Sequence, residues 1–265
     1  TLLEGMKILE RTGGILSIHA ENDTLIQTLT DRLMAEGRNG PRAFLDSHPP
    51  YSELEAVQRV FFLAKRAPRC RVHIAHMSIP EGMELLRRCR GEGMNNLSAE
   101  TCPQYLGMCE DDLVAIGAPA KCDPPVRSAE AVEKLWGYVL DGTVDIIASD
   151  HSPHPFSRKT GREADFWTVA EGCTGIQTML PVVLTEGRKR GLSWERLVQL
   201  MAERPADLFG LRGRKGRIAP GHDGDIVLLD PEREWVLEDG DLQHLVKQSP
   251  FTGRTFRGRV VKTFV

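Results

Sequence analysis

The sequence lacks any apolar run that approaches the roughly 18 to 20 residues a membrane-spanning helix needs. Its start, Thr1-Leu2-Leu3-Glu4, does not have the form of a signal peptide, and we expect a cytoplasmic protein. Neither sign of charge is in clear excess, because 34 lysines and arginines stand against 37 aspartates and glutamates, a net charge of -3. Without a basic field, neither nucleic acid nor an anionic membrane is expected as a partner.

A disulfide framework is not expected either. The cysteines are scattered without a CxxC pair, in a chain far larger than those that depend on disulfides, and we expect reduced thiols in the core or near a pocket. The composition, 41% hydrophobic and 27% charged, is typical of a globular protein with a sizeable core. The six cysteines are Cys70, Cys89, Cys102, Cys109, Cys122 and Cys173.

Short apolar stretches alternate with amphipathic segments along most of the chain. This alternation favours strand-helix units on a parallel sheet over a sandwich or a helical bundle. The first, second and fourth expected strands are rich in Ile, Val and Leu, as in strands buried on both faces. The four strands are predicted at residues 14–20, 71–76, 96–100 and 144–149.

Two segments fit the capping-box spacing, in which a serine and a glutamate three residues later satisfy the first free amides of a helix. Helices are therefore predicted to begin at Ser52 and at Ser78. A later helix, residues 194–203, is predicted to end before Pro205, with a short turn over residues 206–211. The first two helices carry apolar residues at three-to-four spacing, namely Val57, Val60, Phe61 and Ala64, then Met83, Leu86 and Cys89.

The pattern changes from about Gly213, where glycines separate short strand-like stretches. We expect two parts: residues 1–212, the α/β part, and residues 213–265, a small β segment. Four strand-helix units make half of an eight-unit barrel, and half a barrel leaves strand edges unpaired. The chain also stops on Phe264 and Val265 inside an apolar strand, whereas domain ends usually lie at the surface. We expect an N-terminal part and a C-terminal piece to be absent from this sequence or to come from another chain.

Polar side chains cluster at the carboxyl ends of three predicted strands. His19 and His76 follow the first and second strands, and Asp150 follows the fourth. In parallel barrels, catalytic groups converge at this edge, and histidine with aspartate suits zinc and similar divalent ions. Each residue alone has a simpler interpretation, as a buried histidine bonded to a carbonyl or an aspartate that caps a helix. Their convergence predicts a metal site.

The other histidines receive lesser roles. His73 and His76 are three positions apart and point to opposite faces of a regular strand, so only one can face the barrel interior. We choose His76, which is nearer the strand end, and expect His73 to serve in packing or to support a ligand. His151 and His154 are expected to line the pocket or support ligands, and His48, His222 and His244 to be ordinary loop residues.

Several segments resemble those of the cyclic amidohydrolase family and occur in that family's order. They are VHIAHMS at residues 72–78, ETCPQYL at 100–106, KCDPPVR at 121–127 and SDHSP at 149–153. The resemblance continues through GIQ at 175–177, GRIAPG at 216–221 and residues 253–254, and therefore covers nearly the whole chain.

This resemblance implies an α/β fold, the C-terminal half of a TIM-type (β/α)8 metal-dependent hydrolase barrel with part of a small β-sandwich domain. It also implies two divalent metal ions, usually zinc, with His19 and His76 as ligands of one ion. Asp150 would bind the other ion and act as the catalytic proton carrier. The family's remaining ligands, a carboxylated lysine among them, would lie before Thr1. A homotetramer or homodimer is the assembly that the family implies.

The chemistry that the resemblance implies is the opening of a cyclic amide. Metal ions lower the pKa of bound water from about 15.7 towards roughly 7, which makes a hydroxide that attacks a ring carbonyl, and Asp150 would pass the proton to the leaving nitrogen. By resemblance, the segments around Asp123 and around Glu171 and Gly172 bind the ring through backbone groups. Asp123 stands where relatives commonly have a small or amide residue, a change that could alter charge selection or simply form a turn. Gln104 stands where many relatives have histidine.

Within the family the segments favour allantoinase, which converts allantoin to allantoate in purine catabolism. Dihydroorotase and hydantoinase or dihydropyrimidinase are alternatives, since each shares part of these segments. A non-catalytic scaffold protein on the same fold is a further alternative, because fold alone does not establish function, although the retained His19, His76 and Asp150 argue against it. Cys102 and Cys122 are not expected to be nucleophiles, since no His/Asn partner pattern accompanies them.

Overall fold

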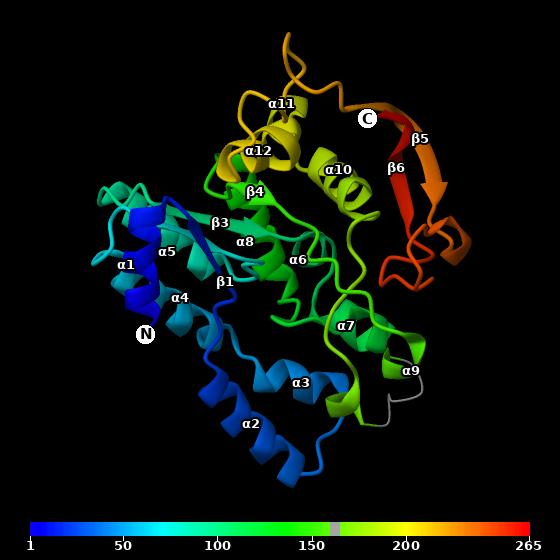
Figure 1. Ribbon diagram of the computed structural model, residues 1–265. Coiled ribbons are helices and arrows are strands. Elements are labelled where there is room, and N and C mark those ends of the chain that lie inside the picture. The colour runs from blue at the N-terminus through cyan, green and yellow to red at the C-terminus, as the bar shows by residue number, and fades with distance from the viewer. Residues whose placement is uncertain (160–164) are drawn as a thin grey trace.

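The computed structural model describes residues 1–159 and 165–265, and a four-stranded parallel sheet with the order β1-β2-β3-β4 lies at its centre (Figure 1). The register aligns Ile18 with Ile74, and Thr101 with Ile147, so the carboxyl ends of the strands share one edge. The parallel sheet that the sequence predicts is confirmed, with strands shorter than expected. The strands are β1 (Ile15–Ile18), β2 (Arg71–Ile74), β3 (Leu97–Thr101) and β4 (Ile146–Ile147).

Helices α4, α5 and α8 pack beside the sheet, with α4 against α5, and α5 against both α8 and β3. The predicted apolar residues of α4 and α5 are buried in the core, as the helical spacing requires. None of the helices in the described ranges combines the length and apolarity that crossing a membrane requires. The helices are α1 (Leu2–Thr12), α2 (Asp23–Ala35), α3 (Pro41–Ser47), α4 (Pro50–Ala64), α5 (Pro80–Gly91), α6 (Pro103–Gly107), α7 (Glu110–Ile116), α8 (Ala129–Asp141), α9 (Phe156–Lys159), α10 (Met179–Lys189), α11 (Trp194–Val198) and α12 (Arg204–Leu208).

The two predicted capping boxes are wrong. Helices α4 and α5 begin at Pro50 and Pro80 instead, since proline suits the first helical position, where its missing amide costs nothing. Ser52 therefore lies inside α4 and donates its hydroxyl to the Pro49 carbonyl at 2.8 Å. The hydroxyl of Ser78 donates instead to the buried carboxylate of Glu53.

The predicted helix end before Pro205 is also wrong. After α11 the chain forms a π-helical turn, Gln199–Glu203, and continues directly into α12. Proline removes one amide from a helix interior, and the wider hydrogen-bond spacing of the π turn just before it accommodates that loss. Helical structure therefore runs through the proline, and the first part of the expected turn, residues 206–208, belongs to α12.

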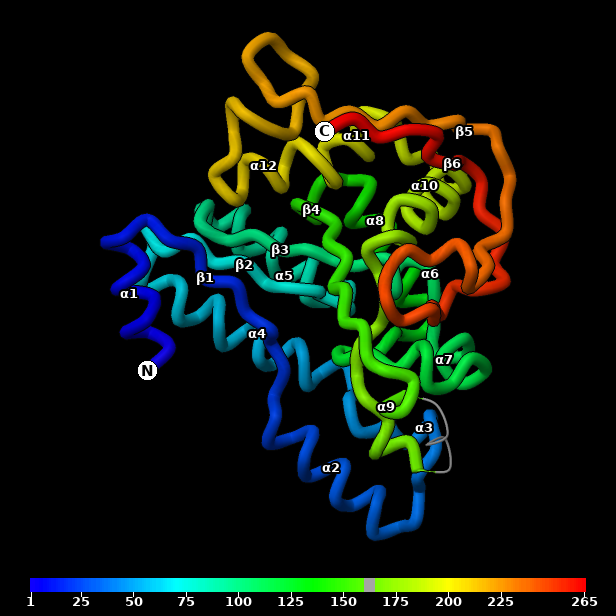
Figure 2. The backbone as a smooth tube through the Cα atoms, turned by 45° about the vertical axis from the view of Figure 1, so that its right-hand side comes forward, coloured from blue at the N-terminus to red at the C-terminus, as the bar shows by residue number. Residues whose placement is uncertain are grey.

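A second sheet follows in the chain. Strands β5 (Ile226–Val236) and β6 (Thr255–Phe264) form an antiparallel hairpin whose register is irregular after Leu228 and after Asp230. The hairpin packs against α10 on the side of the molecule opposite α1 (Figure 2). The close approach to α10 requires Gly258, where an added Cβ would lie 2.2 Å from Leu184.

Helices α2 and α3 contact each other and extend away from the sheet (Figure 1). Asn22 caps α2 by accepting the Leu25 amide at 3.1 Å. Because Asn22 comes only three residues after His19, α2 starts immediately beyond the polar end of β1. This arm therefore forms one wall of the candidate site.

Candidate functional site

The end of β1 and the end of β2 bring two histidines together. His19 directly follows β1, and His76 lies two residues beyond β2. Nδ1 of His19 lies 3.1 Å from Nε2 of His76, and the ring centroids are 4.8 Å apart in a T-shaped arrangement. Two nitrogen ligands of a tetrahedral zinc ion, each at roughly 2.0 to 2.1 Å from it, lie about 3.3 Å apart. The spacing of the pair therefore fits two ligands of one metal ion.

Glu21 orients the ring of His19. Its side chain is only 3% exposed, and its Oε2 lies 3.2 Å from Nε2 of His19. This contact is the largest cause of the raised pKa of His19. With a proton on Nε2 facing the carboxylate, the lone pair on Nδ1 is free to face His76, which is how carboxylates fix the tautomer of metal-binding histidines. Glu21 was missed by the sequence analysis, although its two-residue spacing from His19 puts both on one face of an extended segment.

His76 and Asp150 share an unusual backbone conformation. Their φ angles are 36° and 44°, and in the described part of the chain they are the only residues other than glycine with positive φ. Such conformations cost about 1 to 3 kcal/mol each and occur preferentially at functional sites. The two strained positions coincide with two of the three predicted metal ligands.

Glu100 holds His76 in place. Its Oε1 accepts the His76 amide at 3.3 Å, while its Oε2 lies 3.0 Å from Nε2 of His73. Nδ1 of His73 is 2.8 Å from the Ser98 hydroxyl, so both ring nitrogens of this buried histidine have partners and neither is free for a metal ion. The strand ends at Ile74, before His76, and the alternation of faces therefore does not extend to His76.

Asp150 follows β4, and its Oδ2 accepts a hydrogen bond from Nε2 of Gln104 at 3.2 Å. Among the described contacts it makes no hydrogen bond or ion pair with His19 or His76. Its position depends on Gly175, where an added Cβ would lie 2.1 Å from the Ser149 carbonyl oxygen. The next residue, His151, accepts the Gly175 amide on Nδ1 at 3.1 Å, which ties the Asp150 loop to the segment after Gly172.

Asp123 lies on the other side of His19. His19, Glu21 and Asp123 each offer one ligand atom within 4.8 Å of the others, and they are the one group of this kind found among the described residues. Burial and the nearby Glu21 carboxylate raise the pKa of Asp123 to about 7. The Asp123 carboxylate also lies 3.4 Å from Nε2 of His48.

His48 is a site residue, and its assignment to an ordinary loop is wrong. It is 6% exposed at the end of α3, with Nδ1 3.0 Å from the Phe44 carbonyl oxygen. Burial lowers the pKa of His48, which favours the neutral ring. His244, likewise expected to be an ordinary loop residue, packs its ring 5.3 Å from that of His151.

A cavity of about 600 Å³ opens beside these residues, between α2 and the segment 165–171. Asp123 and Glu171, two of the predicted substrate-binding residues, line it together with His19. The third, Gly172, lies outside the lining, with its amide donating to the Lys121 carbonyl at 2.9 Å. The full lining is His19, Glu21, Asp23, Ile26, Gln27, Thr30, Met34, Phe44, His48, Asp123, Asp165, Trp167, Thr168 and Glu171.

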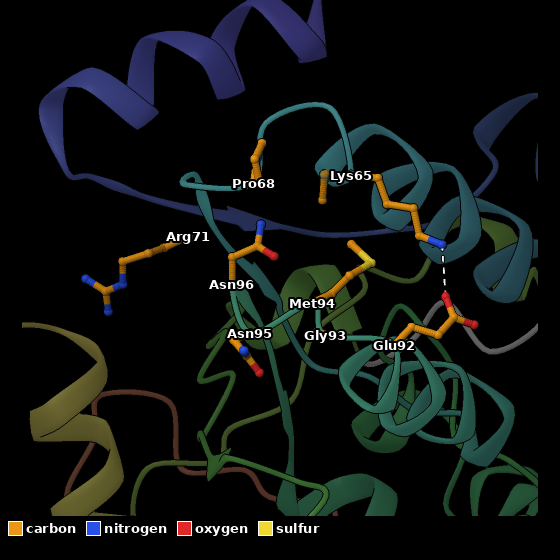
Figure 3. A pocket seen from close by; sticks show the side chains of 9 residues that line it. Lys65, Pro68, Arg71, Glu92, Gly93, Met94, Asn95 and Asn96 are labelled. Carbon is orange, nitrogen blue, oxygen red and sulfur yellow. Dashed lines mark hydrogen bonds and ion pairs between the residues drawn. The ribbon is translucent and has the colours of Figure 1, made fainter.

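A second cavity, of about 680 Å³, lies at the amino ends of β2 and β3 (Figure 3). Its charged groups are already paired, since Lys65 bonds Glu92 at 3.0 Å and Arg71 donates to the Leu208 carbonyl. In parallel barrels the catalytic groups gather at the carboxyl ends of the strands. The cavity beside His19 is therefore the candidate active site.

Cys102 and Cys122 are poor candidates for a nucleophile. All six are free thiols, and Cys102 and Cys122 are fully buried. Burial raises the pKa of Cys102, and a hydrogen bond with Cys173 together with burial raises that of Cys122. A thiol with a raised pKa is a poor nucleophile at neutral pH.

Residues 6–265 match the amidohydrolase family, and the chain belongs to this family. Over its whole length the chain is 43% identical to an allantoinase of Rubrobacter xylanophilus, of which it covers 58%, and 41% identical to one of Solibacter usitatus, of which it covers 57%. Over 99% of its length it is 38% identical to an Escherichia coli allantoinase, of which it covers 57%. The chain thus spans somewhat more than half the length of these relatives.

Solved structures of related enzymes have the same fold as this chain. The whole chain superposes on 58% of an L-hydantoinase (dihydropyrimidinase) from Arthrobacter aurescens with a TM-score of 0.96 at 38% identity. It superposes on 58% of a dihydropyrimidinase from Brevibacillus agri with a TM-score of 0.93 at 29% identity. The predicted family and fold class, part of a TIM-type hydrolase barrel with an added β segment, are confirmed.

Proposed function

We propose that the protein to which this chain belongs hydrolyses a C–N bond of a cyclic ureide, converting allantoin to allantoate. The observation that carries the proposal is the 3.1 Å approach of His19 Nδ1 to His76 Nε2, beside a cavity that His19 lines. The identity of 38% to 43% with allantoinases favours allantoin as the ring.

In this proposal His19 and His76 hold one divalent ion and Asp150 helps to hold a second, with zinc as the expected metal. The donor set fits, because Glu21 leaves Nδ1 of His19 free and both histidines come from neighbouring strand ends. The remaining ligands, including a carboxylated lysine, are expected in the part of the relatives' length that this chain does not span. When bound, the metal ions supply a hydroxide from water at neutral pH and polarise the ring carbonyl.

The chain's own residues then move the proton. As the hydroxide oxygen adds to the carbonyl carbon, an Asp150 carboxylate oxygen accepts the proton that this oxygen still carries. It returns that proton to the ring nitrogen as the C–N bond breaks, so the products are a carboxylate and a free amide or urea nitrogen. The Gln104 amide at 3.2 Å orients Asp150 for both transfers. The segments of Asp123, Glu171 and Gly172 bind the ring.

The domain organisation, cellular location and assembly that we propose are those that the family resemblance implies. We propose residues 1–212 as barrel and 213–265 as part of the small β domain, a cytoplasmic location, and a homotetramer or homodimer. Hydantoinase or dihydropyrimidinase activity is the second candidate, favoured by the TM-score of 0.96 with the Arthrobacter enzyme. Dihydroorotase and a non-catalytic scaffold remain lesser alternatives.

A substrate panel tests the proposal. The protein to use carries this chain together with the part of its relatives' length that the chain does not span, hereafter the full-length protein. Initial rates with allantoin, hydantoin, dihydrouracil and dihydroorotate give kcat/KM for each ring. The highest kcat/KM for allantoin supports the proposal. A higher value for hydantoin or dihydrouracil selects the second candidate, and turnover of none of them supports the scaffold.

A further inference from the structure

The cavity beside His19 is rich in acidic groups. Apart from the imidazoles of His19 and His48, its titratable lining residues are all carboxylates, and no lysine or arginine side chain is among the lining residues. Lys121 lies behind the wall, 1% exposed, and bonds Glu171 at 3.2 Å while donating to the Phe166 and Val169 carbonyls. The carboxylates that line the cavity are Glu21, Asp23, Asp123, Asp165 and Glu171.

Asp123 is the carboxylate that a bound ring would meet beside the metal ligands. Its side chain is 26% exposed, faces the cavity, and belongs to the tight cluster with His19 and Glu21. Glu21 lies behind it with both carboxylate oxygens buried, and its Oε2 lies 3.2 Å from Nε2 of His19. The two acids therefore form one continuous acidic surface next to His19.

A buried network fixes the Asp123 loop. Arg127, 3% exposed, donates to the His48 carbonyl at 2.5 Å and to the Ser78 hydroxyl at 2.8 Å. The Tyr105 hydroxyl donates to the Pro124 carbonyl at 2.9 Å. On the other side of Asp123, the Gly172 amide donates to the Lys121 carbonyl at 2.9 Å. The backbone that carries Asp123 therefore cannot move away from an unfavourable ligand without disturbing buried hydrogen bonds.

The charge of this surface has opposite effects on two kinds of ring substituent. A carboxylate substituent beside Asp123 would place like charges together in a partly desolvated site, which strongly disfavours binding. A neutral substituent with N–H groups, such as a ureido or carboxamide group, can donate hydrogen bonds to the same oxygens, and such charge-assisted bonds are the stronger kind. Discrimination between the two kinds of substituent then comes both from repulsion of the carboxylate and from hydrogen bonds to the N–H groups.

We propose that Asp123, with Glu21 behind it, is a specificity determinant that accepts cyclic ureides with an uncharged, N–H-bearing substituent and excludes rings that carry a carboxylate. This inference rests on the proposed function and narrows its substrate class.

The test compares two rings that differ in charge but hardly in shape, hydantoin-5-acetamide and hydantoin-5-acetate. For the full-length wild-type protein we expect kcat/KM to favour the acetamide by about 100-fold. In Asp123→Asn and Asp123→Ser the ratio falls at least tenfold, mainly through a lower KM for the acetate. A ratio within one variant cancels any general loss of activity. Asp23→Asn, which removes an exposed carboxylate from the same lining, is the matched control and keeps the wild-type ratio.

Three outcomes are informative. A ratio that falls in both Asp123 variants and stays high in Asp23→Asn supports the inference. A wild type that opens allantoin or hydantoin but has a ratio near one, or a ratio that both Asp123 variants retain, overturns the inference and leaves the proposed function standing. A wild type that opens none of allantoin, hydantoin, dihydrouracil and dihydroorotate overturns the proposed function, and the inference falls with it.

Discussion

Nδ1 of His19 and Nε2 of His76 lie 3.1 Å apart although 57 residues separate the two histidines. Their approach follows from the parallel register of β1 and β2, which aligns Ile18 with Ile74 at the polar edge of the sheet. Two ring nitrogens facing each other at this distance need either a shared proton or a shared cation. Metal binding to the protein, and variants of the residues that surround the pair, separate these possibilities.

Glu21→Gln should weaken metal binding. The carboxylate 3.2 Å from Nε2 of His19 fixes the ring tautomer, and loss of such a partner typically lowers metal affinity by roughly 10- to 100-fold. Competition between the full-length protein and a chromophoric chelator measures the change. Glu36→Gln, on the surface at the end of α2, serves as control and should keep the wild-type affinity. Equal affinities of all three proteins would remove Glu21 from the site.

Asp150→Asn should abolish ring opening while leaving the fold intact. The amide cannot accept and return the proton, and loss of a general acid-base group lowers kcat by roughly 100- to 10,000-fold. Rates with allantoin, and circular dichroism to check the fold, make the measurement. A folded variant with rates close to wild type would show that the proton moves by another route.

Arg127→Met should strongly destabilise the protein. Arg127 and Glu53 are 3% and 2% exposed and lie 3.0 Å apart, and removal of one partner leaves a buried charge alone at a cost of about 3 to 5 kcal/mol. Arg59→Met, which breaks a surface pair with Glu55, should cost less than about 1 kcal/mol. Urea denaturation gives both free energies of unfolding, and similar losses in the two variants would contradict this interpretation.

Gly175→Ala should destabilise the loop that carries Asp150. The added Cβ would lie 2.1 Å from the Ser149 carbonyl oxygen, which forces the backbone apart and costs about 1 to 3 kcal/mol. Gly137→Ala, inside α8 with open space around the new Cβ, should instead stabilise by about 0.4 to 1 kcal/mol. Melting temperatures should therefore shift in opposite directions, and a neutral Gly175→Ala would mean that the segment relaxes freely.

Asp123→Asn should change how stability depends on pH. The pKa of Asp123 is about 7 in the folded protein, above the value of roughly 3.9 expected for an unfolded chain. Between these values the folded state keeps a proton that the unfolded state has released, so Asp123 lowers stability progressively as pH rises from about 4 to 7, with no further change above. The variant lacks this slope.

Denaturation of the metal-free protein at pH 5 and at pH 8 measures this effect. The free energy of unfolding of Asp123→Asn, relative to wild type, should be higher at pH 8 than at pH 5. The same difference at both values would mean that Asp123 has an ordinary pKa.

The sequence predicts those features of the site that depend on repetitive structure. Parallel strands end at one edge of a sheet, so apolar stretches followed by histidine or aspartate were enough to find His19, His76 and Asp150. The same pattern did not predict that His48 and Glu21 lie in the site, and the cause differs for the two residues. His48 reaches Asp123 only through the packing of α3, whereas Glu21 follows a strand as His19 does and required attention to same-face spacing.

The errors in helix boundaries have a local physical cause. Ser52 and Ser78 have the right glutamate spacing for caps. A proline two residues away occupies the first helical position instead, Pro50 in α4 and Pro80 in α5. Pro205 is usually a helix terminator, and only the preceding π turn, which no simple sequence pattern predicts, allows helical structure to continue.

Metal content measured together with allantoin hydrolysis in the full-length protein tests the central claim most directly. The account predicts about two divalent ions per chain, loss of activity on chelation, recovery on addition of zinc, and loss of both metal and activity in a His19→Asn, His76→Asn double variant. A folded wild-type protein that binds no divalent ion and does not open allantoin would contradict it.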